Sequence, residues 1–144
     1  MSQVYDPSSD VLTIKGTILP PSGQLGQERF RVTFPPSATS EPATDGSAAT
    51  MVTRSRMATL TISCLQQDAT HVAMLALLAE QQASGVDKPA WPVNLKRIGG
   101  TGGVTETVNA NNGTILQQPD VVSAGSIQVV TWTVSLDGVT RVAA

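Results

Sequence analysis

The chain has 144 residues, which predicts one domain, and only 14% of them are charged, below the roughly one quarter of an average protein. The formal net charge is −2 and no basic run occurs, which argues against a protein that grips nucleic-acid phosphates. A single cysteine, Cys64, excludes an internal disulfide bond, and no apolar run approaches the ~20 residues of a membrane span.

The composition also indicates the surroundings of the chain. A soluble monomer normally carries more charged residues on its surface. This chain has Thr, Ser, Gln, Asn and Ala instead, as expected when partner subunits cover the surface. A secreted, polar β-domain is the alternative. The N-terminal residues MSQVYDPSSD lack a charged-then-apolar signal pattern, so we expect a chain kept in a reducing cytoplasm or exported without a signal.

Two strands are predicted in the first part of the chain. Val11–Leu19 is rich in β-branched residues, and the prolines that follow it end the strand. Glu28–Phe34 alternates, with Phe30, Val32 and Phe34 on one face and arginine and threonine on the other. This pattern predicts a strand with one packed side and one wet or interfacial side.

A long polar segment, residues 35–50, follows these strands. It contains three prolines and almost no large apolar residue. Loops of this length inside a compact domain are usually functional or disordered. We expect an extended arm that becomes ordered against a neighbouring subunit, with a mobile surface loop as the alternative.

The longest predicted strand is Met51–Leu65. One parity carries the apolar residues Ala58, Leu60, Ile62 and Cys64, and the other carries Thr59, Thr61 and Ser63. The parity of Cys64 indicates a small buried side chain rather than a reactive thiol. Arg54 and Arg56 precede the core pattern on its apolar parity, so this end of the strand is expected to protrude from the domain.

One helix is predicted after this strand. Asp68 is a suitable N-cap, and Gly85 is a suitable stop. Apolar residues repeat at helical spacing at Val72, Leu75, Ala76 and Ala79, and Met74, Leu77 and Leu78 widen the stripe. We therefore expect one face to pack on the sheet and some apolar surface to remain for another subunit.

The last third of the chain is again predicted as strands. Trp91–Ile98 forms one strand, and the glycines of residues 99–103 end it. Val104–Asn109 and Gly113–Gln117 flank Asn111-Asn112-Gly113, a signal that predicts a hairpin turn. The final alternating run, Gly125–Leu136, sets Val130, Trp132, Val134 and Leu136 against a parity that includes Thr131, Thr133 and Ser135.

No group of residues indicates a catalytic, cofactor or metal site. The glycines of residues 99–103 lack the lysine and the following helix of a phosphate loop. His71, the only histidine, has Asp68 one helical turn away but no nucleophile or further ligand, so an exposed polar side chain is expected.

Two pairs of acidic residues occur close together in the sequence, Glu41 with Asp45 and Asp6 with Asp10. A glycosidase uses such a pair, but aromatic residues usually line its sugar site. Trp91 and Trp132 both fall within strand patterns, where packing in the core is expected instead. The acidic pairs therefore give no support for catalysis.

One stretch has a specific resemblance to a known family. A run around the longest predicted strand is similar to a motif of tail tube proteins from contractile-tailed phages. This run is Val52-Thr53-Arg54-Ser55-Arg56, followed by Leu60-Thr61-Ile62 and then Leu65-Gln66-Gln67-Asp68. The order of elements also resembles the fold that these proteins share with the type VI secretion tube protein. The motif resemblance covers residues 28–90, and the proline content of residues 35–50 departs from the family's plain hairpin.

The resemblance implies a mainly β fold with one α-helix, a two-sheet antiparallel β-sandwich or barrel flanked by the helix, with residues 1–144 as one tail-tube-like domain. It implies a homo-oligomer of hexameric rings that stack into a hollow conduit for DNA ejection, with no cofactor, no membrane anchor and no specific DNA binding. Tail sheath, baseplate and tape-measure proteins are the implied partners. The implied location is the phage tail, assembled in the host bacterial cytoplasm.

Two groups of residues are expected to serve this assembly. The arm and its base would carry contacts between rings, through Pro35, Pro36, Glu41, Pro42, Asp45, Arg54 and Arg56, with the arginines pairing to acidic residues of a neighbour. Small hydroxyl side chains on two strands would line the lumen, at Thr59, Thr61, Ser63, Thr131, Thr133 and Ser135. Alternatively, these hydroxyls face solvent or pair with a neighbour in the ring.

Three other functions are compatible with the sequence. A baseplate or hub protein, or the tube subunit of a tailocin or type VI-like machine, would differ in partners rather than in fold. A carbohydrate-binding β-sandwich would expose Trp91 or Trp132, so burial of both would argue against it. An enzyme has the least support.

Overall fold

The structure is a computed structural model that describes residues 10–19, 30–52, 56–83, 91–99 and 103–143. The predicted residues Asp6, Arg54 and Gly85 lie outside these ranges. The described elements are β1 (Val11–Ile14), β2 (Thr17–Ile18), β3 (Phe30–Thr33), β4 (Ala38–Pro42), β5 (Ala48–Val52), β6 (Ala58–Leu65), α1 (Ala69–Ala83), β7 (Trp91–Arg97), β8 (Glu106–Gln117), β9 (Val129–Asp137) and β10 (Thr140–Ala143). The predicted mainly β fold with one helix is confirmed over this part of the chain.

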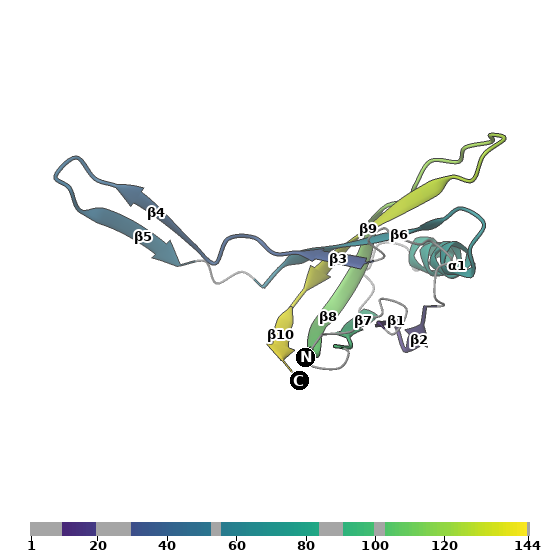
Figure 1. Cartoon of the computed structure of the whole chain (residues 1–144), viewed down its shortest axis with the longest axis horizontal. Coiled ribbons are helices and arrows are strands. Elements are labelled where there is room, and N and C mark those ends of the chain that lie inside the picture. Colours follow the sequence, from purple (N-terminus) through teal and green to yellow (C-terminus); the bar gives the residue numbers. More distant parts are fainter. Residues whose placement is uncertain (1–9, 20–29, 53–55, 84–90, 100–102, 144) are drawn as a thin grey trace.

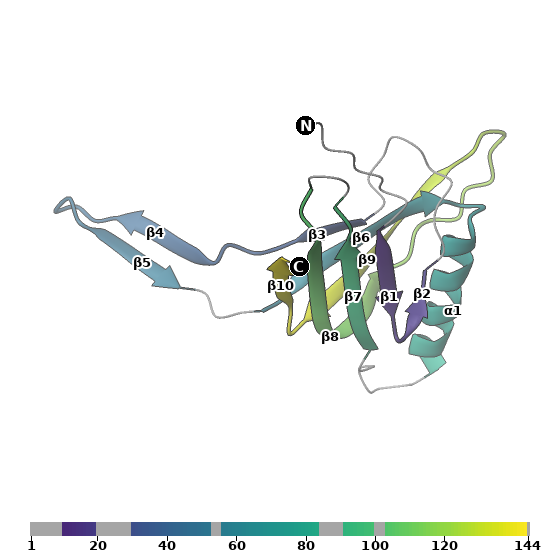
Figure 2. The ribbon, with the colours of Figure 1, turned by 60° about the horizontal axis from the view of Figure 1, so that its bottom comes forward.

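The main sheet has eight antiparallel strands and folds over into two layers. Its order is β2-β1-β7-β8-β9-β6-β3, with β10 also paired to β8. Figure 2 shows β10, β8, β7, β1 and β2 side by side, with β6 and β9 crossing behind them. Strand β8 connects the layers, because it pairs with β7 in one and with β9 in the other. The predicted antiparallel, sandwich-like architecture is therefore confirmed.

The core lies between the two layers and is built from alternate residues of the strands. Strand β6 alternates strictly between buried and half-buried positions, and β9 follows the same rule over most of its length. Leu60, Ile62 and Trp132 are fully buried, and so is Cys64, as its parity predicted. Burying each large aliphatic side chain contributes about 1.5–3 kcal/mol, so these two strands supply a large part of the driving force.

Helix α1 lies beside the sandwich and begins directly after Asp68, as predicted (Figure 1). The backbone carbonyl of Asp68 accepts hydrogen bonds from the amides of His71 and Val72, which starts the helix. Its carboxylate accepts a hydrogen bond from the Leu65 amide at 3.1 Å, and this bond fixes the turn between β6 and α1.

The face of α1 that packs on the sheet differs from the predicted one. Thr70, Met74 and Leu77 are buried, whereas Val72 is 63% and Leu75 is 44% exposed. The apolar residues of this helix extend around much of its circumference, so spacing alone does not select a face. The buried face is the one that meets β6 and β8, the strands that α1 contacts.

Two strand predictions are wrong for reasons of local backbone geometry. Val11–Leu19 is a tight hairpin rather than one strand, because Lys15 and Gly16 both have positive φ, 54° and 78°. Positive φ at both central residues is the requirement of a type I′ turn. Met51–Leu65 is also interrupted, since β5 ends at Val52 and β6 begins at Ala58.

The hairpin predicted at Asn111-Asn112-Gly113 is also wrong, because β8 runs through these residues as the longest described strand. Strand β7 pairs with one edge of β8, and β9 followed by β10 pairs with the other edge. Asp137 pairs with Asn112 and Thr140 with Asn109, so β9 and β10 keep one register along β8. These non-local pairings outweigh the local turn preference.

Candidate assembly surfaces

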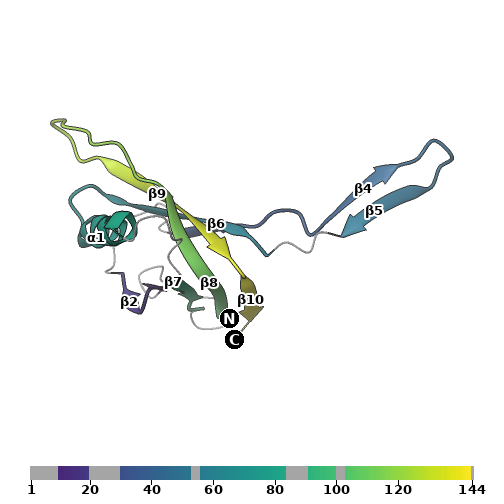
Figure 3. The same cartoon turned by 180° about the vertical axis from the view of Figure 1, so that it is seen from behind.

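The segment predicted as an arm is a β-hairpin, β4–β5, which stands away from the sandwich (Figure 3). At its turn the Gly46 amide donates to the Ala43 carbonyl at 3.1 Å, and Gly46 takes a positive φ of 88°. Asp45 Oδ1 accepts hydrogen bonds from both the backbone amide and the side-chain hydroxyl of Ser47. These bonds lower the pKa of Asp45, and the bond from the hydroxyl has the largest effect. The sequence Thr-Asp-Gly-Ser is thus a turn signal that the sequence analysis missed.

The arm hairpin, residues 38–52, has an unusual surface. Every side chain from Ser40 to Met51 is exposed, and Met51 is 71% exposed. Predicted contact residues are spread along it, with Glu41 and Pro42 on β4 and Asp45 at the turn. The remaining predicted residues, Pro35, Pro36 and Arg56, lie at its base and line one pocket there.

The six predicted hydroxyl residues form one continuous surface, which we call the hydroxyl face. They pair directly across β6 and β9, Thr59 with Ser135, Thr61 with Thr133 and Ser63 with Thr131. All six alternate with buried residues, so they point away from the core. Strand β3 extends the same face, because Arg31 pairs with Thr61 and Thr33 with Thr59.

Both tryptophans are buried, at 7% exposed for Trp91 and 0% for Trp132. Trp132 Nε1 donates a hydrogen bond to His71 Nδ1 at 3.1 Å, and the two rings are tilted by 53°. His71 is therefore a half-buried structural acceptor, and the prediction of an exposed polar side chain is wrong. The burial of both indoles argues against the carbohydrate-binding interpretation.

The described residues hold little reactive chemistry. They contain no cluster of three or more His, Cys, Asp or Glu side chains that could hold a metal ion. Burial, with a smaller effect from the Asp68 charge, raises the pKa of the Cys64 thiol to about 11, so this thiol stays protonated at neutral pH. Within the described ranges, no helix is long and apolar enough to cross a membrane.

A pocket of about 170 Å³, which we call the end pocket, opens where β3 faces the layer of β7, β8 and β10. It is lined by Phe30, Val32, Phe34, Leu95, Arg97, Glu106, Val108 and Arg141. At its rim Arg141 pairs with Glu106 at 2.7 Å and stacks over the Phe34 ring at 5.5 Å. The sequence analysis missed this pocket, because the residues come from four strands and no local pattern connects them.

Comparisons with known proteins identify the fold. No family model and no curated protein matches the sequence. The structure is similar to a chain of the PVC sheath–tube complex of an extracellular contractile injection system in its extended state, with a TM-score of 0.59 at 12% identity over 98% of this chain and 93% of that one.

Two further solved structures are similar. The terminating cap of the anti-feeding prophage tube has a TM-score of 0.58 at 13% identity, over 100% of this chain and 94% of that one. The PVC sheath/tube terminator in the extended state has a TM-score of 0.54 at 12% identity, over 92% and 91%. At such identities the similarity establishes the fold, and this chain has a contractile-tail-tube-like fold.

Proposed function

We propose that the chain is a non-enzymatic structural subunit of a phage tail tube, which self-assembles into stacked hexameric rings that form a hollow conduit for DNA ejection. The observation that carries this proposal is the arm hairpin, whose side chains are exposed from Ser40 to Met51. The fold shared with contractile injection system proteins supports the same role.

The arm hairpin requires a partner for physical reasons. An isolated two-stranded hairpin is at best marginally stable in water, and its outer edges present unpaired backbone groups. Its surface is rich in alanine, threonine and serine and carries only Glu41 and Asp45 as charges. A neighbouring copy that packs on this surface or pairs with an edge would stabilise it. Arg56, which lies at the base of the arm, is the proposed partner of these acids in that copy.

The hydroxyl face is the proposed lining of the conduit. The hydroxyl groups themselves are neutral and offer DNA hydrogen bonds but no attraction to its phosphates. Arg31 on the adjoining strand β3 adds a positive charge, while the chain as a whole carries a net charge of −2. DNA would therefore pass without being held. Sheath, baseplate and tape-measure proteins are the proposed partners, and the phage tail, built in the host cytoplasm, is the proposed location.

A cap or hub role is the second candidate. It is favoured by the similarity to the anti-feeding prophage tube cap and to the PVC sheath/tube terminator. Both matches cover at least 91% of each chain, as the match to the sheath–tube complex also does. A subunit of a tailocin or type VI-like tube would share the same fold. A cap subunit is expected to form single rings, whereas a tube subunit forms stacks of any length.

Negative-stain electron microscopy of the purified protein over a concentration series tests the proposal. We expect hollow tubes of the wild-type chain, and monomers when residues 38–52 are replaced by a short Gly-Ser linker. Fluorescence of the buried Trp132 provides the control that the sandwich of this variant remains folded. Single rings would favour the cap, while a wild-type protein that stays monomeric at high concentration would contradict self-assembly.

A further inference from the structure

The end pocket is open to solvent and borders the hydrophobic core. Phe30, Val32 and Leu95 line it and also pack against the core cluster. Phe34, at its mouth, is 38% exposed although it is a large apolar side chain. An apolar site of this size that borders the core gains free energy when an aliphatic side chain displaces water from it.

The rim of the end pocket is net positive. Arg97 and Arg141 line it together with one acid, Glu106. A second pocket at the arm base shares Phe34 and Arg141 with it and adds Arg56. The fitting occupant therefore combines an aliphatic side chain with an adjacent negative charge.

The loop between β8 and β9, residues 118–128, carries this combination. Val121 is 91% exposed and Ile127 is 66% exposed, and both are aliphatic. Asp120 directly precedes Val121 and is the only charged residue of the loop. A valine exposed to this degree in a loop is a candidate for insertion into a partner.

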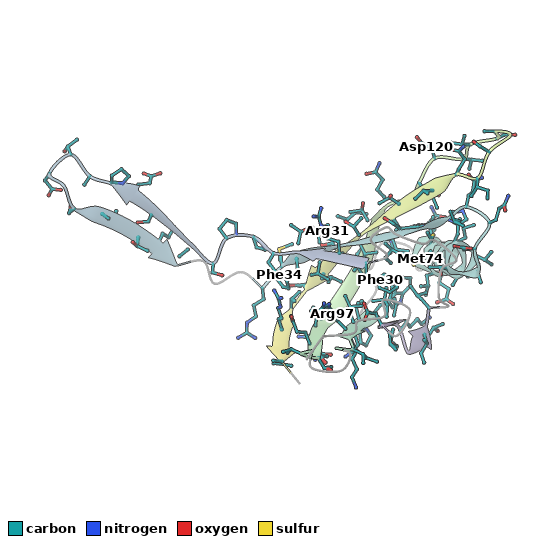
Figure 4. The ribbon with its side chains drawn as sticks, in the orientation of Figure 1. Phe30, Arg31, Phe34, Met74, Arg97 and Asp120 are labelled. Atoms are coloured by element: carbon teal, nitrogen blue, oxygen red, sulfur yellow. The ribbon has the colours of Figure 1, made fainter. Side chains whose placement is uncertain are left out.

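The loop and the pocket of one chain lie too far apart to meet. Figure 4 places Asp120 toward the end of the molecule opposite the arm, and Phe34 and Arg97 on the side of the sandwich from which the arm leaves. A contact between them must therefore join two copies. In a tube of repeated subunits such a contact would be head-to-tail, and head-to-tail contacts produce rings or open-ended stacks.

We propose that Val121 of one copy inserts into the end pocket of the next copy, with Asp120 facing the rim that Arg97 and Arg141 form. This inference rests on the proposed function, because it specifies one contact of that assembly. One side chain in a pocket buries far less than the roughly 1,600 Å² of a stable interface, so the contact depends on other contacts made by the same copies.

Disulfide crosslinking between two variants, each with one introduced cysteine, tests this contact. Val121→Cys is mixed with a fluorescently labelled Glu106→Cys chain, a change at the pocket rim that keeps both arginines. The natural Cys64 is buried and does not compete. We expect a labelled heterodimer under mild oxidation, and its loss when Val72→Cys, on the exposed face of α1, replaces Glu106→Cys. No heterodimer, or the same yield with Val72→Cys, would overturn the proposal.

A charge swap provides the second measurement and does not depend on cysteine geometry. Asp120→Lys in the Val121→Cys chain should abolish the crosslink, and Arg97→Glu in the partner chain should restore it. Failure of the swap to restore the crosslink would count against the assigned rim contact. Hollow tubes without the crosslink would support the proposed function and refute this contact. The crosslink without tubes would support this contact and count against the proposed function.

Discussion

His71 occupies a position in which its charge state affects the core. Its Nδ1 accepts the hydrogen bond of the fully buried Trp132, so that nitrogen must be unprotonated in the folded state. Burial lowers the pKa of His71 below its ordinary value of 6.5. The unfolded chain therefore binds a proton at a higher pH than the folded chain does.

This difference predicts that stability falls as the pH is lowered through 6.5. Below that pH the unfolded state binds more protons at this site, which favours unfolding, until the folded pKa is passed. Urea unfolding at pH 7.5 and pH 5.5 measures the loss. His71→Asn keeps a hydrogen-bond acceptor but cannot titrate, so it should show a smaller loss. If it loses as much stability as the wild-type chain, His71 is not the cause.

The close packing of Gly113 against Val93 gives this glycine a role within β8, although its local sequence predicts a turn. A Cβ atom at this position would lie 2.5 Å from Val93 Cγ2, and Val93 is a stiff, buried side chain of the neighbouring strand. Glycine is therefore present for close packing of β7 on β8, rather than for a reversal of the chain.

We predict that Gly113→Ala lowers the free energy of unfolding by about 1–3 kcal/mol, as expected when a well-packed core is overfilled. Gly125→Ala is the matched control, because a Cβ there meets no atom within 4 Å, and its effect should stay within about 0.5 kcal/mol. Chemical denaturation measures both. Equal effects of the two substitutions would show that the close approach to Val93 does not affect the free energy of unfolding.

At the scale of elements, Gln81 attaches α1 to the sheet. Its side-chain amide donates to the Ile115 carbonyl at 2.9 Å and accepts from the Ile115 amide at 2.8 Å. Strand β7, Trp91–Arg97, begins opposite Gly113, two residues before Ile115. Gln81 therefore takes the place of a neighbouring strand at that edge.

Gln81→Ala is expected to destabilise the fold by about 1–3 kcal/mol, because Ile115 is buried and both of its backbone groups would lose a partner. Gln82→Ala, one residue along on the exposed side of the helix, should change stability by less than about 0.5 kcal/mol. Thermal unfolding of the two variants side by side measures the difference. A Gln81→Ala variant as stable as the wild-type chain would refute this role.

At the scale of the whole molecule, the hydroxyl face connects fold to proposed function. We predict that Thr131→Lys, at an exposed position of this face, leaves assembly intact and makes the tubes retain DNA in a salt-dependent manner. Repeating one lysine around each ring would add a ring of positive charge to the lining, beyond that of Arg31 on β3. DNA co-sedimentation with purified tubes at low and high salt measures the retention.

Ala79→Lys, on the exposed side of α1, is the control and should not cause the same retention. If Thr131→Lys prevents assembly, the hydroxyl face lies at an interface between subunits. If it assembles but retains no more DNA than the control, the face lies outside the conduit. Either result would reject its assignment as the lining.

Strand alternation is a local, two-residue period, so the amino-acid pattern alone indicated which side chains of β6 and β9 face the core. It also determined the start of α1 at Asp68, since capping involves only neighbouring residues. The folded structure was needed to see that β8 passes through Asn111 to Gly113, and that Met74 rather than Leu75 is buried. It alone placed the hydroxyls of β6 and β9 in register and assembled the end pocket. Pairing, packing and pockets depend on contacts between residues far apart in the chain, and no local pattern encodes them.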